Sequence, residues 1–368
     1  MNAPVSPLEI FRSLGIPSRR VEDWKYTDLR GAIDAEAFDR PNGLVVAVAK
    51  PGEIDVLIDD SLPDWAIRSV QRMPFAGAID AAARAFDPKI VAVRVPAGVE
   101  VKEPLRLEYQ SAGAAQIVLL LERGASLTWF DVHRPQGDGL RNISVSAFIE
   151  EGACLTHFRQ AQFAVELASV ETVSVVLGRK STYRAHVLES GGKLARGEWN
   201  VVLDGEGANA EIFGATVLGH GAHADVTTRI DHAIGNTSSR QLFKKVVADH
   251  SRAVYQGKIT VRKDANGSDS RQTAKAVLLG ARAEADLKPE LEILADDVKC
   301  AHGAAIGDLD ADSLFYLRSR GIAPPEARSL LLKAFLGEAV DAIESDALRA
   351  QAWQFVDDGL ANVMKAQS

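Results

Sequence analysis

Turns that recur at a constant spacing constrain this 368-residue chain more than any other feature. From about Ile90 onward, small and turn-forming residues interrupt the sequence about every 28 residues. One set of turns is Gly124-Ala125, Gly152-Ala153, Arg179-Lys180, Gly207-Ala208 and Gly235-Asn236. A second set, offset from the first and lacking a member near Glu166, is Gly137-Asp138, Gly191-Gly192, Gly221-Ala222, His250-Ser251 and Gly280-Ala281. A repeat of this length without helices is typical of a solenoid.

Apolar and polar residues alternate between these turns. The pattern is clear at residues 143–149, 224–230 and 255–261, which read as strands with one apolar face. A large β-sandwich also contains short strands at regular intervals. The even spacing favours a β-helix instead, so we predict one continuous β-solenoid from about Ile90 to Gly307.

The two ends of the chain differ from this pattern. Residues 1–88 read as a mixed, partly helical unit that starts with a helix capped by Ser6-Pro7. Residues 308–368 contain three helical segments, capped by Asp310 or Asp312, Pro324-Pro325 and Ser345. We therefore predict three domains, at 1–88, 89–307 and 308–368. Because stacked coils leave an unpaired strand edge at each end, an end must be covered or must serve as an interface.

Composition excludes several classes of function. A net charge of −8 argues against nucleic-acid binding. We expect no membrane span, because the strongly apolar run at 117–121 is far too short. With no apparent signal peptide and two distant cysteines, the expected compartment is the reducing cytoplasm. Residues Gly191-Gly192-Lys193 are followed by Leu194, so they are not a P-loop, and we find no ATP site.

The candidate site lies where the strand pattern ends, in KPELEILADDVKCAHGAAIGDL at residues 288–309. Cys300 and His302 are two residues apart, so a strand presents both side chains on one face. They are the softest pair of potential metal ligands in the chain. The residues alone favour core packing for this pair, and we interpret the other cysteine, Cys154, as a buried structural thiol. We interpret His220, His223 and Asp225 as polar turn residues, since 220 and 223 fall on opposite strand faces.

Longer segments add a family resemblance. Residues 289–322, PELEILADDVKCAHGAAIGDLDADSLFYLRSRGI, closely resemble the C-terminal signature of the SufB/SufD family of iron–sulfur cluster assembly proteins. Residues 238–279 resemble the preceding coils of that family, and SRRVEDWKYTDL at 18–29 resembles the N-terminal motif of its SufD members. The segments 24–26, 240–243 and 299–303 are more similar to SufD than to SufB.

The resemblance implies a fold and a role. The expected fold is mainly β, a right-handed parallel β-helix flanked by helical domains. The expected role is a non-enzymatic scaffold that pairs with a SufB-like subunit and binds a SufC-like ABC ATPase, which carries the ATP. His302, with Cys300, would lie at the subunit interface where a transient iron–sulfur cluster is built, the remaining ligands coming from the partner. No cofactor is expected to bind tightly to this chain alone.

Two further expectations concern partners. The isolated chain is expected to form a homodimer through the same strand edge. The apolar side of the second C-terminal helix, with Leu330, Leu331, Ala334 and Phe335, is expected to bind the ATPase. On the residues alone, the third helix could equally cover that surface. The alternative functions are a carbohydrate-active β-helix enzyme and a solenoid interaction protein without a metal role.

Overall fold

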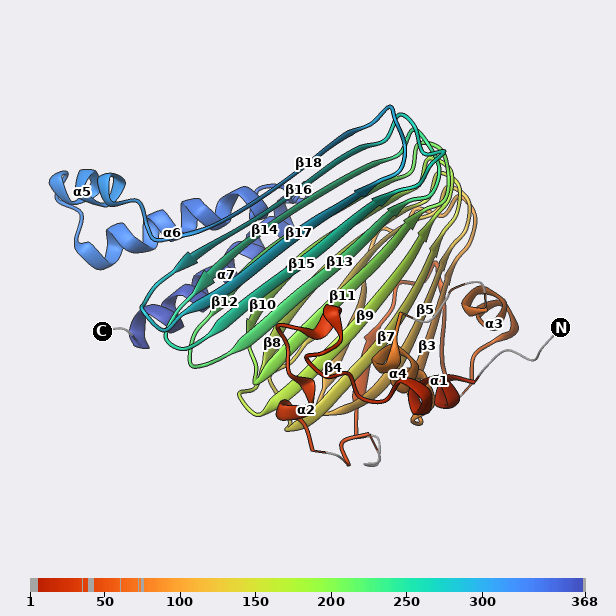
Figure 1. The fold of residues 1–368 in the computed structure, drawn as a ribbon. Coiled ribbons are helices and arrows are strands. Elements are labelled where there is room, and N and C mark those ends of the chain that lie inside the picture. The colour runs from red at the N-terminus through yellow and green to blue at the C-terminus, as the bar shows by residue number, and fades with distance from the viewer. Residues whose placement is uncertain are drawn as a thin grey trace.

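The structure is a computed structural model that describes residues 6–34, 36–38, 43–59, 61–71, 73 and 76–366. Its body is a solenoid in which successive strands alternate between two nine-stranded sheets (Figure 1). Sheet A contains, in order, β1 (Val45–Ala49), β4 (Leu105–Gln110), β6 (Ser126–His133), β8 (Cys154–Phe163), β10 (Thr182–Gly191), β12 (Asn209–Leu218), β14 (Ser238–Val247), β16 (Asp269–Leu278) and β18 (Lys299–Gly307). Sheet B contains β17 (Glu284–Ile293), β15 (Arg252–Val261), β13 (His223–His232), β11 (Leu194–Leu203), β9 (Leu167–Leu177), β7 (Gly139–Ile149), β5 (Gly113–Leu121), β3 (Lys89–Val95) and β2 (Asp55–Asp59).

Strands within each sheet are parallel and in register from β3 to β18. Only the first strand of each sheet differs, because β1 pairs with β4 and β2 with β3 in antiparallel fashion. The predicted β-solenoid is therefore confirmed, and the β-sandwich alternative is wrong. β1 and β2 come from the part of the chain before residue 88, and the domain division itself stays a prediction.

The first set of turns forms one corner of the solenoid. Each corner amide donates to a carbonyl of the next coil, as Gly124 does to Glu151, Gly152 to Arg179 and Gly207 to Asn236. The backbone at this position is left-handed in successive coils, which favours Gly or Asn over other residues. The residues that adopt this conformation are Gly98, Gly124, Gly152, Lys180, Gly207, Asn236 and Gly267. At the opposite corner, the turn expected near Glu166 is closed by a bond from the amide of Leu167 to the carbonyl of Ala164.

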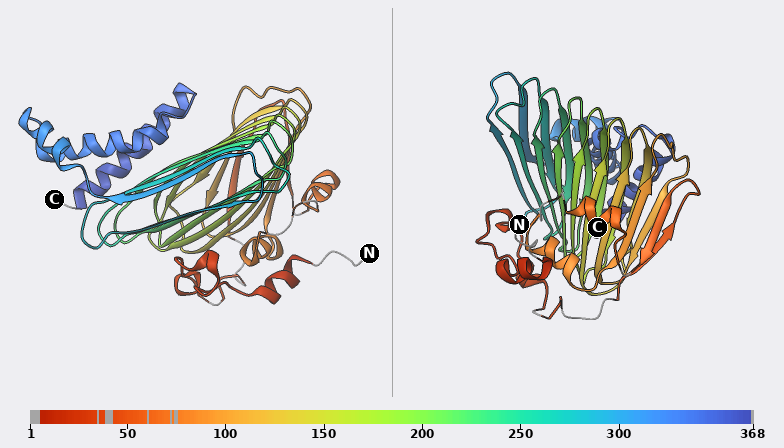
Figure 2. Two further views of the ribbon diagram at one scale, coloured as in Figure 1. Left: turned by 45° about the horizontal axis from the view of Figure 1, so that its top comes forward. Right: turned by 90° about the vertical axis from the view of Figure 1, so that its right-hand side faces the viewer.

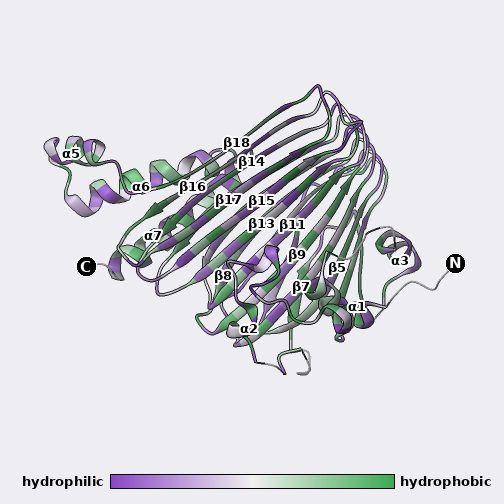
Figure 3. Cartoon of the chain, in the orientation of Figure 1, coloured by the Kyte–Doolittle hydropathy of each residue, from purple (hydrophilic) through white to green (hydrophobic). Residues whose placement is uncertain are grey.

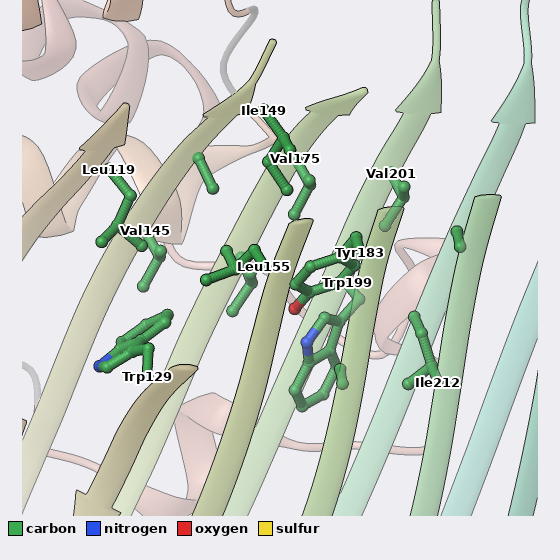
Figure 4. Packing of buried hydrophobic residues seen from close by; sticks show 14 of the residues in the cluster. Leu119, Trp129, Val145, Ile149, Leu155, Val175, Tyr183, Trp199, Val201 and Ile212 are labelled. Carbon is green, nitrogen blue, oxygen red and sulfur yellow. The ribbon is translucent and has the colours of Figure 1, made fainter. Parts of the chain in front are cut away.

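The main core fills the space between the sheets. Figure 4 shows side chains from sheet A, including Trp129 and Tyr183, facing side chains from sheet B, including Val145 and Trp199. All four are at most 1% exposed. The residues in between point outward, which gives the strands their alternating hydropathy in Figure 3.

The N-terminal part covers the outer face of sheet B (Figure 2). It contains α1 (Pro7–Leu14), a 3-10 turn at Glu22–Trp24, α2 (Leu29–Ala32), α3 (Asp64–Val70) and α4 (Ala78–Ala85). The predicted Ser6 cap is present, with Glu9 completing a capping box. Residues 18–29 lie on the strands through polar side chains: Trp24 stacks at 4.2 Å on the Arg196 guanidinium, and Glu22 pairs with Lys288 of β17. Because polar contacts rather than an apolar face attach this irregular segment to the sheet, its sequence needs no amphipathic periodicity.

The C-terminal helices cover the outer face of sheet A. They are α5 (Ala311–Ser319), α6 (Pro324–Val340) and α7 (Asp346–Ala366), and they begin at the predicted positions. Side chains of α6 and α7, among them Leu336 and Phe355, form a second core with outward residues of sheet A such as Phe213. The helix α5 contacts α6 and extends beyond the sheets (Figure 1). No helix among the described residues is long and apolar enough to cross a membrane.

Acid should destabilise this fold through histidines that are buried without charge. His186 of β10 lies under the C-terminal helices between the rings of Phe158 and Phe213, and burial lowers its pKa to about 4. The unfolded chain binds a proton at that residue below about pH 6.5, whereas the folded chain does not. Stability is therefore full above pH 6.5 and falls towards pH 4, by up to about 3 kcal/mol from this residue.

We expect His186→Gln to flatten the dependence of the unfolding free energy on pH between 6.5 and 4. The measurement is urea unfolding at several pH values. His250→Gln, at an exposed corner, is the matched control and should keep the wild-type slope. An unchanged slope in His186→Gln would show that this residue is not the source of the acid sensitivity.

Candidate functional site

The last coil of the solenoid has an open edge. β18 ends sheet A and β17 ends sheet B, so their outer backbone groups have no strand partner among the described residues. Both strands are long, at 9 and 10 residues, and apolar side chains are exposed beside them, including Ile293, Leu294 and Ile306. An uncovered edge of this kind readily pairs with another strand.

Cys300 and His302 lie on this edge strand. Cys300 is in register with Ser270 of β16, and His302 is in register with Gln272. Both residues therefore occupy the face of β18 that continues the inward face of sheet A, as the two-residue spacing predicts. Cys300 is half-buried and packs against the main core, whereas His302 is exposed. The core-packing interpretation thus holds in part for Cys300 and not for His302.

The Cys300 thiol is kept protonated in this chain. Burial raises its pKa, and a hydrogen bond from the backbone of Ser270 offsets only part of that effect. A thiol must lose its proton to bind a metal, so attraction between the cation and the thiolate has to offset the free-energy cost of removing that proton. One thiolate and one imidazole also leave a closed four-ligand site half complete. A metal site built on this pair would therefore need further ligands.

Buried polar side chains lie next to this pair on the preceding strands of sheet A, in register with Cys300 and His302. Gln272 lies next to His302, and Gln241 occupies the same position one coil deeper. Ser239 and Ser270 stack behind Cys300 with their hydroxyl oxygens 2.6 Å apart. The sequence does not predict this column, because its members are brought together only by the register: Gln241, Gln272 and His302 follow Trp129, His157, Ala185 and Ile212 at the same position of successive coils.

A second cluster of ligand-type residues is buried deep inside the solenoid. His133 Nε2 lies 3.5 Å from an oxygen of Asp131 and 3.3 Å from one of Glu171. This is the only group of three such residues found close together in the described part of the chain. Burial alone raises the pKa of Asp131, but His133 and His157 outweigh burial and hold that pKa well below its usual value.

The charges around this second cluster already balance. Arg159 contacts Glu171 and lies 3.6 Å from Glu189, while burial lowers the pKa of Lys245 and nearby Glu189 offsets that effect in part. Three acidic side chains lie among three basic ones, namely Asp131, Glu171 and Glu189 among Arg141, Arg159 and Lys245, while burial raises the pKa of Glu189. A divalent cation would leave uncompensated positive charge in the interior, which is costly. The cluster is accordingly an internal salt-bridge network.

The structure also shows where the His220, His223 and Asp225 group and Cys154 lie. His220 is an exposed corner residue, while His223 and Asp225 share the hydroxyl of Thr27 on the outer face of sheet B. The three residues therefore do not converge on one site. Cys154 is half-buried rather than buried as predicted, and it begins β8 beside Arg184 and Glu211.

The predicted ATPase-binding residues fall into two groups. Leu330 and Ala334 are exposed on α6, and Leu330 is 43% exposed. Leu331 and Phe335 are half-buried and line a groove of about 400 Å³ that also contains Ile306 of the open edge. Other apolar residues of α6, such as Leu332 and Leu336, are buried against sheet A and α7. The exposed apolar surface of α6 is thus smaller than the predicted set of four residues, and Phe315 of the neighbouring helix α5 is 74% exposed.

Comparisons with known proteins agree on one family. The family model described as "SUF system FeS cluster assembly, SufBD core domain" matches residues 107–335. The iron–sulfur cluster assembly protein SufD of Escherichia coli is 30% identical over an alignment that covers 92% of this chain and 88% of that protein. The iron–sulfur cluster assembly SufBD family protein slr0076 of Synechocystis is 31% identical, covering 72% of this chain and 62% of that protein. The chloroplastic protein ABCI7 of Arabidopsis thaliana is 30% identical, with coverage of 72% and 59%.

The internal salt-bridge network should be sensitive to the loss of one charge. Arg159→Met leaves Glu171 and Glu189 without their closest cation, so the free energy of unfolding should fall by about 3–5 kcal/mol. The matched control is Arg179→Met, which breaks an exposed corner pair with Glu151 and should cost at most about 1 kcal/mol. Urea unfolding of both variants tests this expectation. Equal, small losses would mean that the interior network contributes no more than a surface ion pair.

Proposed function

The chain belongs to the SufBD family of iron–sulfur cluster assembly proteins, and we propose that it acts as a non-enzymatic scaffold subunit of a SufBCD-type complex. The observation that carries this proposal is the open edge, which presents a thiol and an imidazole beside unpaired strand groups. The chain would act in the cytoplasm without a tightly bound cofactor. The iron–sulfur cluster is its cargo.

The open edge is the proposed surface for a SufB-like partner. A second β-helix with a similar last coil would extend both sheets across the contact by main-chain hydrogen bonds. The exposed Ile293, Leu294 and Ile306 would be covered at the same time. His302 and Cys300 would then face ligands of the partner, which would complete the coordination that this chain leaves half made. In isolation the same edge would support a homodimer.

The second partner is an ABC-type ATPase of the SufC kind. Its proposed binding surface consists of Leu330, Leu331, Ala334 and Phe335 on α6, together with Phe315 of α5. Leu330 and Ala334 are exposed, whereas Leu331 and Phe335 border sheet A at the groove. The groove formed with Ile306 connects this surface to the open edge. A movement of the ATPase would therefore reach the subunit interface through adjacent residues, and ATP would be hydrolysed on the partner.

Loss of the imidazole should separate function from folding. We expect His302→Ala to reduce cluster assembly by the complex strongly while Tm stays almost unchanged, because an exposed side chain adds little stability. Assembly is measured by cluster absorbance, and Tm by calorimetry. Lys299→Ala, an exposed residue of the same strand, is the control for a general effect on the edge. A large fall in Tm with assembly intact would contradict the assignment.

Charge on the exposed side of α6 should prevent ATPase binding. Leu330→Glu places a carboxylate in the proposed contact, so binding should weaken at least tenfold while pairing with the SufB-like subunit is retained. Removing residues 309–368 would be a poor test, because Phe213 and its neighbours on sheet A would be uncovered. The control is Gln351→Glu on the exposed side of α7. Undiminished binding by Leu330→Glu in titration calorimetry would place the ATPase elsewhere.

A further inference from the structure

A buried carbonyl oxygen beside the candidate site has no hydrogen-bond partner. Gln272 of β16 is 1% exposed, yet its Oε1 atom makes no hydrogen bond to any described residue. Such groups are rare because leaving an acceptor dry and unpaired costs free energy. His302, one strand further out, is in register with Gln272 on the same inward face. In-register neighbours of adjacent strands run side by side, about 4.8 Å apart.

The other end of the Gln272 amide is fixed. Its Nε2 donates to the hydroxyl oxygen of Tyr255 at 2.8 Å, across the interior on sheet B. The Tyr255 hydroxyl in turn donates to Oε1 of Gln241 at 3.2 Å, and it lies 3.3 Å from the hydroxyl of Thr228. In this arrangement Tyr255 donates to Gln241 and accepts from Gln272, so the carbonyl oxygen of Gln272 is left unpaired.

A glycine makes this arrangement possible. Gly257 lies opposite on sheet B, and a Cβ atom there would be 1.8 Å from Nε2 of Gln272 and 2.5 Å from the Tyr255 hydroxyl. Any other residue would push the Gln272 amide out of its position. The Gln272 amide is thus held by the hydrogen bond from its Nε2 to Tyr255 and by the space that Gly257 leaves on sheet B. Its oxygen remains without a partner on the strand next to the open edge.

We propose that Gln272 is a positioning residue for His302: the two side chains are not bonded in this structure, but a turn of the exposed His302 ring lets Oε1 accept its N–H and so leaves the other ring nitrogen free to bind iron. A histidine ligand commonly donates its second nitrogen to an oxygen, which fixes the tautomer and the ring orientation. Here the acceptor belongs to the neighbouring coil and is buried before iron arrives. The proposal rests on the proposed role of His302 and adds the residue that aims it.

The test reads the tautomer of His302 directly. The full-length chain is labelled with 15N-histidine, and the His302 signals are assigned by their loss in His302→Ala. At a pH where the ring is neutral, the two nitrogen shifts give the ratio of the tautomers. In wild type one tautomer should predominate, and in Gln272→Met its excess should fall about fivefold, as expected from one ordinary hydrogen bond. Gln272→Glu keeps an oxygen of the same reach and should restore the preference.

Ser270→Ala is the matched control, since this buried hydroxyl lies on the same strand, in register with Cys300, and is bonded to Ser239 rather than to Tyr255. It should lower Tm while the His302 tautomer ratio stays as in wild type. An unchanged ratio in Gln272→Met, or an equal change in both variants, overturns the positioning role. Cluster assembly that survives His302→Ala would refute the proposed function instead, whatever the tautomer ratio, so the two failures are distinguishable.

Discussion

Every feature of this molecule depends on the in-register stacking of parallel strands. Main-chain hydrogen bonds place each residue directly over its counterpart one coil away, as in the column Gln241, Gln272 and His302. The side chain of each residue must therefore suit two neighbours that lie nearly 30 positions away in the sequence. A one-residue shift would turn the whole inward face to solvent, so the register is strongly specified. This constraint converts a linear repeat into columns of side chains.

Some columns carry polar or charged groups into the interior, and there the stacking supplies their partners. Asp131, Arg159 and Glu171 neutralise one another across two sheets, and Tyr255 links two glutamines. Such groups are costly to bury singly, and pairing across the sheets offsets part of that cost. Several polar atoms in these columns have no hydrogen-bond partner among the described residues, among them Oδ1 of Asp131, Oε1 of Glu171 and Oε1 of Gln272, and the last of these lies next to the open edge.

Local chemistry predicted much of this structure, and long-range contacts account for what it missed. Turn residues and period-two alternation are local, so the coils, the corners and the caps at Ser6 and Asp310 followed from the sequence. The spacing of Cys300 and His302 likewise placed them on one face. Which residues meet across the interior depends on coil length and twist, so the Asp131 network was not visible. The mixed charges of residues 18–29 also did not predict that ion pairs hold this segment against sheet B.

The two ends of the solenoid deal with their unpaired groups in different ways. At the first end the terminal strands β1 and β2 have only five residues each and run antiparallel to the rest, and short edge strands resist further pairing. At the other end β17 and β18 have 10 and 9 residues, apolar side chains are exposed beside them, and β18 carries the Cys300–His302 pair. The tendency to pair is therefore concentrated at the end that carries Cys300 and His302. In the proposed complex the ligands would be divided between two chains, so formation of the pair would create the site, and separation of the chains would weaken every bond to the cargo at once.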